Sequence, residues 1–176
     1  MKLENLIAKS GISAGEGKKD SRHFIGKKIL DARQDMDSFF INYDNMKEFN
    51  KTSIYRVATE KQFAPPYCII KKGLNVNAYR MRAAYSEKEF LYTNGIYAIK
   101  GEMKDTDILL NITGLVNSSL YAYLNFMLGT SAGVEREQGF FKEIKTLPYV
   151  YSEEIKEKVK EIQKEKQKQW DFKRAS

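Results

Sequence analysis

The stretch YCIIKKGLNVNAYRMRAAYSEKEFLYTNGIYAI, residues 67–99, decides the fold. Short apolar runs alternate in it with segments rich in Gly, Asn and charged residues, a pattern typical of strands joined by turns. Residues 79–85 alternate between apolar and basic side chains, which places Arg80 and Arg82 on one face of a strand. We expect strands at 67–71, 79–85, 90–92 and 96–99, and the Asn94-Gly95 turn predicts a β-hairpin from the last two.

The flanking segments complete an α+β fold. Before residue 67 we expect strands at 39–41 and 53–58 and one helical turn at 44–49. After residue 100 the apolar spacing becomes helical: 107–116 predicts one helix, and Asn117 or Ser118 can cap a second that carries Leu120 and Leu124 in the core. A short helix is expected within 137–147.

The last predicted helix is highly charged and begins at the cap Ser152. Its narrow stripe of Ile155, Val159 and Ile162 either docks on the domain edge or pairs with a partner helix. The sequence thus predicts a strand meander or curved mixed sheet, followed by packed helices and a charged C-terminal helix. We divide it into a domain at 1–151 and a helical extension at 152–176.

The chain has 176 residues, a net charge of +7 and a pI near 9.3. The basic excess lies within residues 1–30 and 61–100. Such a balance favours polyanionic partners, either nucleic acid or an anionic membrane surface. Since no apolar run has the length of a membrane span or a signal peptide, we expect a cytoplasmic protein.

Several classes of site conflict with the composition. Cys68 is the single cysteine and His23 the single histidine, which excludes internal disulfides and the usual Cys/His zinc sites. We expect Cys68 to be buried and His23 to be exposed. The tetrapeptide Ala64–Tyr67 (APPY) is similar to the catalytic loop of adenine methyltransferases, but Ala64 cannot hydrogen-bond a target amino group. The glycines between Gly11 and Gly17 do not have the spacing of a phosphate-binding loop.

The basic, Asn-rich segment around residues 71–82 has the chemistry of DNA recognition. Arg and Asn can bond guanine and adenine edges in a fork, and Lys neutralises phosphates. The candidate contact residues are Lys71, Lys72, Asn75, Asn77, Tyr79, Arg80 and Arg82. A solvated hairpin with a basic outer face is the alternative.

Two further groups are candidates for DNA contact. A second, phosphate-facing arm would consist of Lys18, Lys19, Arg22, Lys27 and Lys28. Arg136, which lies between acidic residues, either contacts DNA or pairs with a carboxylate such as Glu135.

Six segments resemble, in one order, a known family. They are Gly11–Gly15 (GISAG), Phe63–Gly73 (FAPPYCIIKKG), Tyr79–Tyr85 (YRMRAAY), Asn94–Gly101 (NGIYAIKG), Leu115–Leu124 (LVNSSLYAYL) and Gly133–Pro148 (GVEREQGFFKEIKTLP). Together they span about Leu6 to Ile162. The family is the C-terminal specificity domain of type IIG-like adenine-specific DNA methyltransferases, which is related to the target-recognition domains of type I restriction specificity subunits.

The resemblance implies a non-catalytic domain that docks on double-stranded DNA and recognises a short sequence, chiefly in the major groove. A catalytic methyltransferase domain, with or without a nuclease, would lie in the same or another chain and would flip the adenine. S-adenosylmethionine is expected only in that catalytic domain, so this chain needs no cofactor or metal. The chain would then be part of a restriction-modification enzyme, as a piece of a longer protein or as a separate subunit. The alternatives are a protein–protein interaction module, an RNA-binding domain and, least favoured, an enzyme acting on small substrates.

Overall fold

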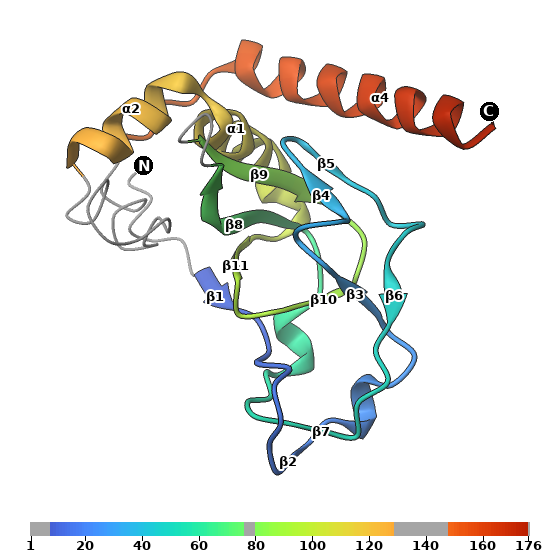
Figure 1. Cartoon of the computed structure of the whole chain (residues 1–176). Helices are drawn as coiled ribbons and strands as arrows, with labels where there is room; N and C mark the ends of the chain where they lie inside the picture. Colours follow the sequence, from blue (N-terminus) through green and yellow to red (C-terminus); the bar gives the residue numbers. More distant parts are fainter. Residues whose placement is uncertain (1–7, 76–79, 129–147, 176) are drawn as a thin grey trace.

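An antiparallel four-stranded sheet lies at the centre of the molecule (Figure 1). The computed structural model describes residues 8–75, 80–128 and 148–175. The strand order is β1 (Ala8–Ser10), β11 (Ile96–Lys100), β8 (Tyr67–Asn75) and β9 (Arg80–Ser86). The β-branched and aromatic residues at the start of β8 favour a strand that is buried on both faces, and Tyr67 through Ile70 are fully buried.

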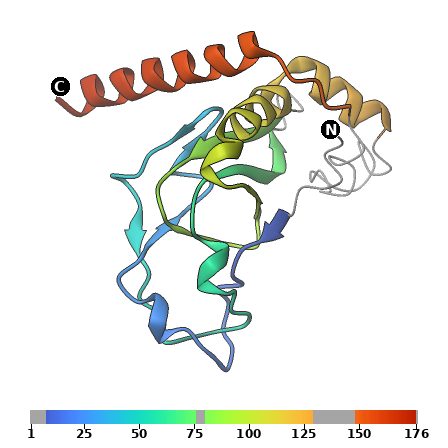
Figure 2. The same cartoon turned by 180° about the vertical axis from the view of Figure 1, so that it is seen from behind.

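Among the described residues, three helices lie on one side of this sheet. They are α1 (Thr106–Asn117), α2 (Ser119–Leu128) and α4 (Glu153–Ala175). Helix α1 packs directly on β8 and β9, and α4 runs across α1 on its outer side (Figures 1 and 2). The core between α1 and the sheet consists mainly of Cys68, Ile70, Met81, Ala83, Ile99, Leu109, Ile112 and Val116.

Short strands cover the opposite face. β3 (Lys28–Leu30) pairs with β6 (Lys47–Glu48) and β10 (Leu91–Tyr92); β2 (Lys19–Asp20) pairs with β7 (Ser53–Ile54); and β4 (Met36–Asp37) pairs with β5 (Phe40–Ile41). Their core is aromatic, with edge-to-face contacts that connect Phe24, Phe49, Phe63, Tyr67, Phe90 and Tyr92. The central sheet therefore separates two hydrophobic cores.

The structure confirms the α+β class, the strands expected at 67–71 (within β8) and at 79–85 (β9), and the helices expected at 107–116, after Ser118 and after Ser152. Ser118 and Ser152 are the caps: their Oγ atoms accept hydrogen bonds from the backbone N–H groups of Tyr121 (3.1 Å) and Ile155 (3.3 Å). The stripe that begins with Ile155 and Val159 docks on α1, which is the first of the two expected alternatives.

The predicted hairpin at 90–99 is wrong. The Asn94-Gly95 turn does form, since Ile96 donates to the carbonyl of Thr93. However, β10 pairs in parallel with β3, while β11 pairs with β8 and β1. The reason is burial: Leu91 and Tyr92 are fully buried in the aromatic core, so β10 belongs to the three-stranded sheet and the chain enters the central sheet only after the turn.

Three smaller expectations also fail. Residues 44–49 contain the strand β6 rather than a helical turn, because Lys47 and Glu48 pair with β3. The strand expected at 53–58 is limited to Ser53–Ile54 and one bridge from Arg56 to Ser13. Leu120, expected in the core, is 59% exposed on α2. The helix expected within 137–147 lies outside the described residues.

Gly114 allows α4 to approach α1 closely. A Cβ atom built at this position would lie 2.3 Å from Cγ2 of Ile155 and 3.1 Å from Cγ2 of Val159. We expect Gly114→Ala to reduce the free energy of unfolding by about 1–3 kcal/mol, because the two helices must separate to admit the methyl group. Urea unfolding measures the change. The matched variant Gly15→Ala, where nothing lies within 4 Å of the added atom, should change stability much less.

Across the described ranges, no helix has both the length and the apolar character needed to cross a membrane.

Candidate nucleic-acid interface

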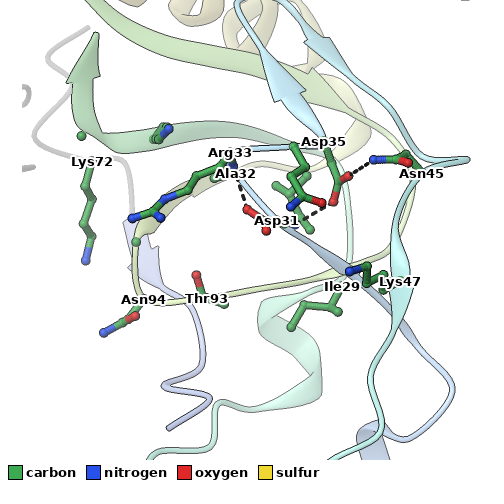
Figure 3. A pocket seen from close by; sticks show the side chains of 15 residues that line it. Ile29, Asp31, Ala32, Arg33, Asp35, Asn45, Lys47, Lys72, Thr93 and Asn94 are labelled. Carbon is green, nitrogen blue, oxygen red and sulfur yellow. Dashed lines mark hydrogen bonds between the residues drawn. The ribbon is translucent and has the colours of Figure 1, made fainter. Parts of the chain in front are cut away.

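Two adjoining hollows open on either side of the β3–β4 loop, and we call them together the basic groove. The first has a volume of about 730 Å³ and lies among residues 29–35, Asn45, Lys47, residues 71–73 and residues 93–95 (Figure 3). The second, of about 350 Å³, lies between residues 33–42, Arg82 and the last turns of α4. Arg33, Gln34 and Asp35 line both hollows, so the two are continuous along the β3–β4 loop.

Basic side chains outnumber acidic ones in this groove. The basic lining residues are Arg33, Lys47, Lys71, Lys72, Arg82, Lys166 and Lys173. The acidic lining residues are Asp31, Asp35 and Asp37. Since the cations come from five separate segments of the chain, their convergence is a property of the fold rather than of one local sequence.

A hydrogen-bonded loop positions Arg33 at the junction of the hollows. Asp35 is 4% exposed, and its carboxylate accepts hydrogen bonds from the backbone N–H of Asp31 (2.8 Å) and from Nδ2 of Asn45 (2.7 Å). Asp31 in turn accepts the backbone N–H of Arg33 (2.8 Å), as Figure 3 shows. These acceptors hold the loop in shape while the Arg33 side chain stays exposed to solvent.

Lys71 and Arg82 are cross-strand neighbours in the register of β8 and β9. Neither has an ion-pair partner within the described residues, although both are half-buried. Burial, together with the positive charges of Arg82 and Arg33, lowers the pKa of Lys71. Like charges directly opposite each other destabilise a sheet, so this pair costs folding free energy that an anionic ligand would recover.

The other predicted residues of this segment have different surroundings. Lys72 lines the first hollow, but its Nζ donates to Oγ of Ser10 (2.9 Å) and lies 4.2 Å from the ring centroid of Tyr97. Arg80 is exposed and donates from Nη2 to Oγ of Ser119 on α2 (2.5 Å), so it lines neither hollow.

Three of the predicted residues, Asn77, Tyr79 and Arg136, lie outside the described residues. Asn75 is the last residue of β8 and is paired in register with Arg80. The structure therefore brings Lys71, Lys72 and Arg82 together at the groove.

The residues of the second predicted arm have different surroundings. Arg22 pairs with Asp20 at 2.8 Å, and hydrogen bonds from the Arg22 side chain and backbone lower the pKa of Asp20 to about 2. Lys27 pairs with Glu89 (2.9 Å), and Lys28 donates to the carbonyl of Met46 (3.0 Å). Lys18 and Lys19 are exposed near β2, at the end of the molecule remote from α4 (Figures 1 and 2).

Sequence reasoning missed four of the basic lining residues, Arg33, Lys47, Lys166 and Lys173. Arg33 and Lys47 belong to the segment 31–60, whose net charge is acidic, and the charge pattern therefore hid them. Lys166 and Lys173 belong to a helix with many charges of both signs, in which no periodicity distinguishes a groove-facing lysine from a solvated one.

Tyr67, which belongs to the tetrapeptide similar to a methyltransferase catalytic loop, has a structural role. The Tyr67 side chain is fully buried among Phe90 and Tyr92, and its hydroxyl donates to the carbonyl of Lys88 (2.7 Å). This ring cannot stack on a flipped base. Cys68 is buried and His23 is exposed, as expected. The described part of the chain holds no group of three or more His, Cys, Asp or Glu side chains placed to bind a metal ion.

No protein-family model matches the sequence, and no curated protein is similar to it at a significant level.

Proposed function

We propose that this chain is a duplex-DNA recognition domain of an adenine-specific DNA methyltransferase or restriction-modification enzyme, without a catalytic site of its own. The observation that carries the proposal is the basic groove, in which Lys71, Arg82 and Arg33 gather and, among the described residues, form no salt bridge with a carboxylate. Cations that form no salt bridge within the protein are available to bind the phosphates of DNA.

The groove also offers groups that can discriminate between bases. Arg33 and Arg82 are fork-shaped donors that match the O6 and N7 atoms of guanine. Gln34, Asn45 and Asn94 line the first hollow and can both donate and accept hydrogen bonds. Phosphate contacts from Lys47 and Lys71 would set the register of the duplex, while the forked and amide side chains would distinguish sequences.

In this proposal the chemistry belongs to a separate methyltransferase domain, with or without a nuclease, in the same or another chain. That domain would bind S-adenosylmethionine and flip the adenine. The complex would act on chromosomal or invading DNA, which is consistent with a cytoplasmic location.

A protein-interaction module is the second candidate, and one surface favours it. Leu120, Tyr123 and Met127 are each more than half exposed on α2, which carries no charged residue. Apolar side chains gathered on one helix are typical of protein contact surfaces. In the proposed enzyme this surface would contact the catalytic domain; in a pure interaction module it would be the functional surface.

Binding to a short random-sequence duplex across a salt series tests the proposal. We expect affinity to fall steeply with salt, because bound phosphates release counterions. Lys47→Gln combined with Lys71→Gln should reduce the slope of log K against log salt by about two, since two phosphate contacts are lost.

The matched control is Lys61→Gln combined with Lys164→Gln. Both lysines are exposed, lie outside the groove, and have no ion pair within the described ranges. This variant has the same net charge as the first and should keep the original slope. Equal slopes in both double variants would reject the basic groove as the DNA surface. No binding of the unaltered chain at low salt would favour the interaction module.

A further inference from the structure

The second hollow of the basic groove combines cations with an unsatisfied donor. Arg33 comes from the β3–β4 loop, Arg82 from β9, and Lys166 and Lys173 from the last turns of α4. Lys166 is engaged, because its Nζ lies 2.5 Å from Oδ2 of Asp37. Within the described residues Arg33, Arg82 and Lys173 have no such carboxylate partner.

Among the described cations of this hollow, Asp37 forms a salt bridge only with Lys166. Its burial acts to raise the pKa of the carboxyl, but hydrogen bonds from Lys166 and the Ser38 backbone, with the charges of Lys166 and Arg82, leave that pKa lowered. Asp37 is therefore ionised at neutral pH and paired with Lys166. Asp35 is occupied by the backbone of Asp31 and the amide of Asn45. The hollow keeps a positive excess at its open side.

Trp170 supplies the unsatisfied donor. Its side chain lines this hollow, and its Nε1 atom is buried with no hydrogen-bond partner in the described part of the chain. An indole N–H almost always finds an acceptor when it is buried, since leaving it unpaired is costly. A donor of this kind next to three unpaired cations points to an anionic acceptor.

We propose that the second hollow is a socket for one phosphate group, held by Arg33, Arg82 and Lys173, with a hydrogen bond that Nε1 of Trp170 donates once the indole turns toward the hollow. A volume of about 350 Å³ is sufficient for a phosphate with part of its water shell. Arginine guanidinium groups match phosphate oxygens in a fork, and lysine adds a point charge. As a contact to the DNA backbone, the socket rests on the proposed function and makes the C-terminal part of α4 a member of the DNA-binding surface.

The chain has a single tryptophan, so one indole N–H resonance in a proton–nitrogen correlation spectrum reports directly on the socket. We expect inorganic phosphate and pyrophosphate to move this resonance downfield to a plateau, because the indole gains an acceptor. Sodium chloride at matched ionic strength should not move it. No movement with either phosphate, or the same movement with chloride, would overturn the socket.

Variants locate the binding. Arg82→Gln and Lys173→Gln should each weaken pyrophosphate binding roughly tenfold or more, since each removes a charge-assisted hydrogen bond. Lys164→Gln, an exposed lysine of the same helix that does not line the hollow, is the control and should bind normally. The remaining resonances show whether each variant keeps its fold. Normal binding in both folded groove variants would also reject the proposal.

A duplex-DNA titration separates this socket from the proposed function. Movement of the indole resonance by duplex and by phosphate, in the same direction, identifies the DNA backbone as the source of the phosphate. Movement by phosphate alone, with no duplex binding at low salt, keeps the socket as a site for a free phosphate compound and removes the DNA function. Duplex binding without any indole movement keeps the function and removes the socket.

Discussion

Replacing Lys71 and Arg82 together by glutamate is expected to reduce duplex binding on the order of 100-fold or more at moderate salt. The two residues face each other across β8 and β9 at the point where the hollows meet. Two attractive phosphate contacts become repulsive, so the loss should exceed that of any pair of neutral substitutions. Fluorescence anisotropy with a labelled duplex measures it.

The stability of these variants to unfolding should change independently of their affinity for DNA. In the unaltered chain the positive charges of Arg82 and Arg33 oppose that of Lys71. Lys71→Glu alone would place opposite charges across the two strands, so we expect equal or slightly higher stability together with weaker binding. If thermal unfolding showed that Lys71→Glu loses binding only because it unfolds, the interpretation of Lys71 as a contact residue would be wrong.

Asn117→Leu is expected to have the largest effect on stability, a loss of about 2–4 kcal/mol in the free energy of unfolding. Asn117 is the last residue of α1, and its side chain binds the backbone of Ala83 in β9. The Oδ1 atom accepts the N–H of Ala83 (3.1 Å), and Nδ2 donates to the carbonyl of Ala83 (2.8 Å) and to that of Thr113 (2.8 Å). Leucine would leave the buried Ala83 N–H without an acceptor among the described residues.

Urea unfolding measures this loss, and Asn50→Leu is the control because Asn50 is exposed in a loop. A local measurement adds specificity: amide hydrogen exchange at Ala83 should accelerate far more than exchange in β11. A loss below about 1 kcal/mol would mean that water or a rearranged α1 accepts the hydrogen bond of the Ala83 N–H in place of Asn117. Since Arg82 is the neighbour of Ala83, the same variant should also weaken binding at the groove.

The spacing of apolar residues in the sequence correctly predicted those strands and helices that bury one apolar face. The alternation around Arg82 predicted β9, and the helical spacing of Leu109 and Ile112 predicted α1, because both elements place one apolar face on a core. Leu120 shows the limit: it continues the same spacing, but the chain turns at Ser118 and α2 leaves this side chain exposed.

Pairings between distant segments could not be predicted in this way. Tyr92 and Ile96 are joined by a turn that is typical of hairpins, yet their strands enter different sheets. The candidate site has the same limit. Lys71 and Arg82 were found from local charge and alternation, whereas Arg33 and Lys173 contribute through the tertiary packing of a loop and a helix end. The net charge of a sequence segment does not show which of its basic residues come together in the folded chain.

The strand order of the central sheet also has a kinetic consequence. Ala8 pairs with Ile99 and Ile29 pairs in parallel with Leu91, so β1 and one edge of β3 find these partners only after the central third exists. During synthesis β1 therefore waits unpaired and β3 has only β6 beside it, and loop closure over such separations slows folding. The antiparallel neighbours β8 and β9, joined by a short connection and soon covered by α1, are the expected folding nucleus, and the β3–β4 loop that carries Arg33 would be ordered last.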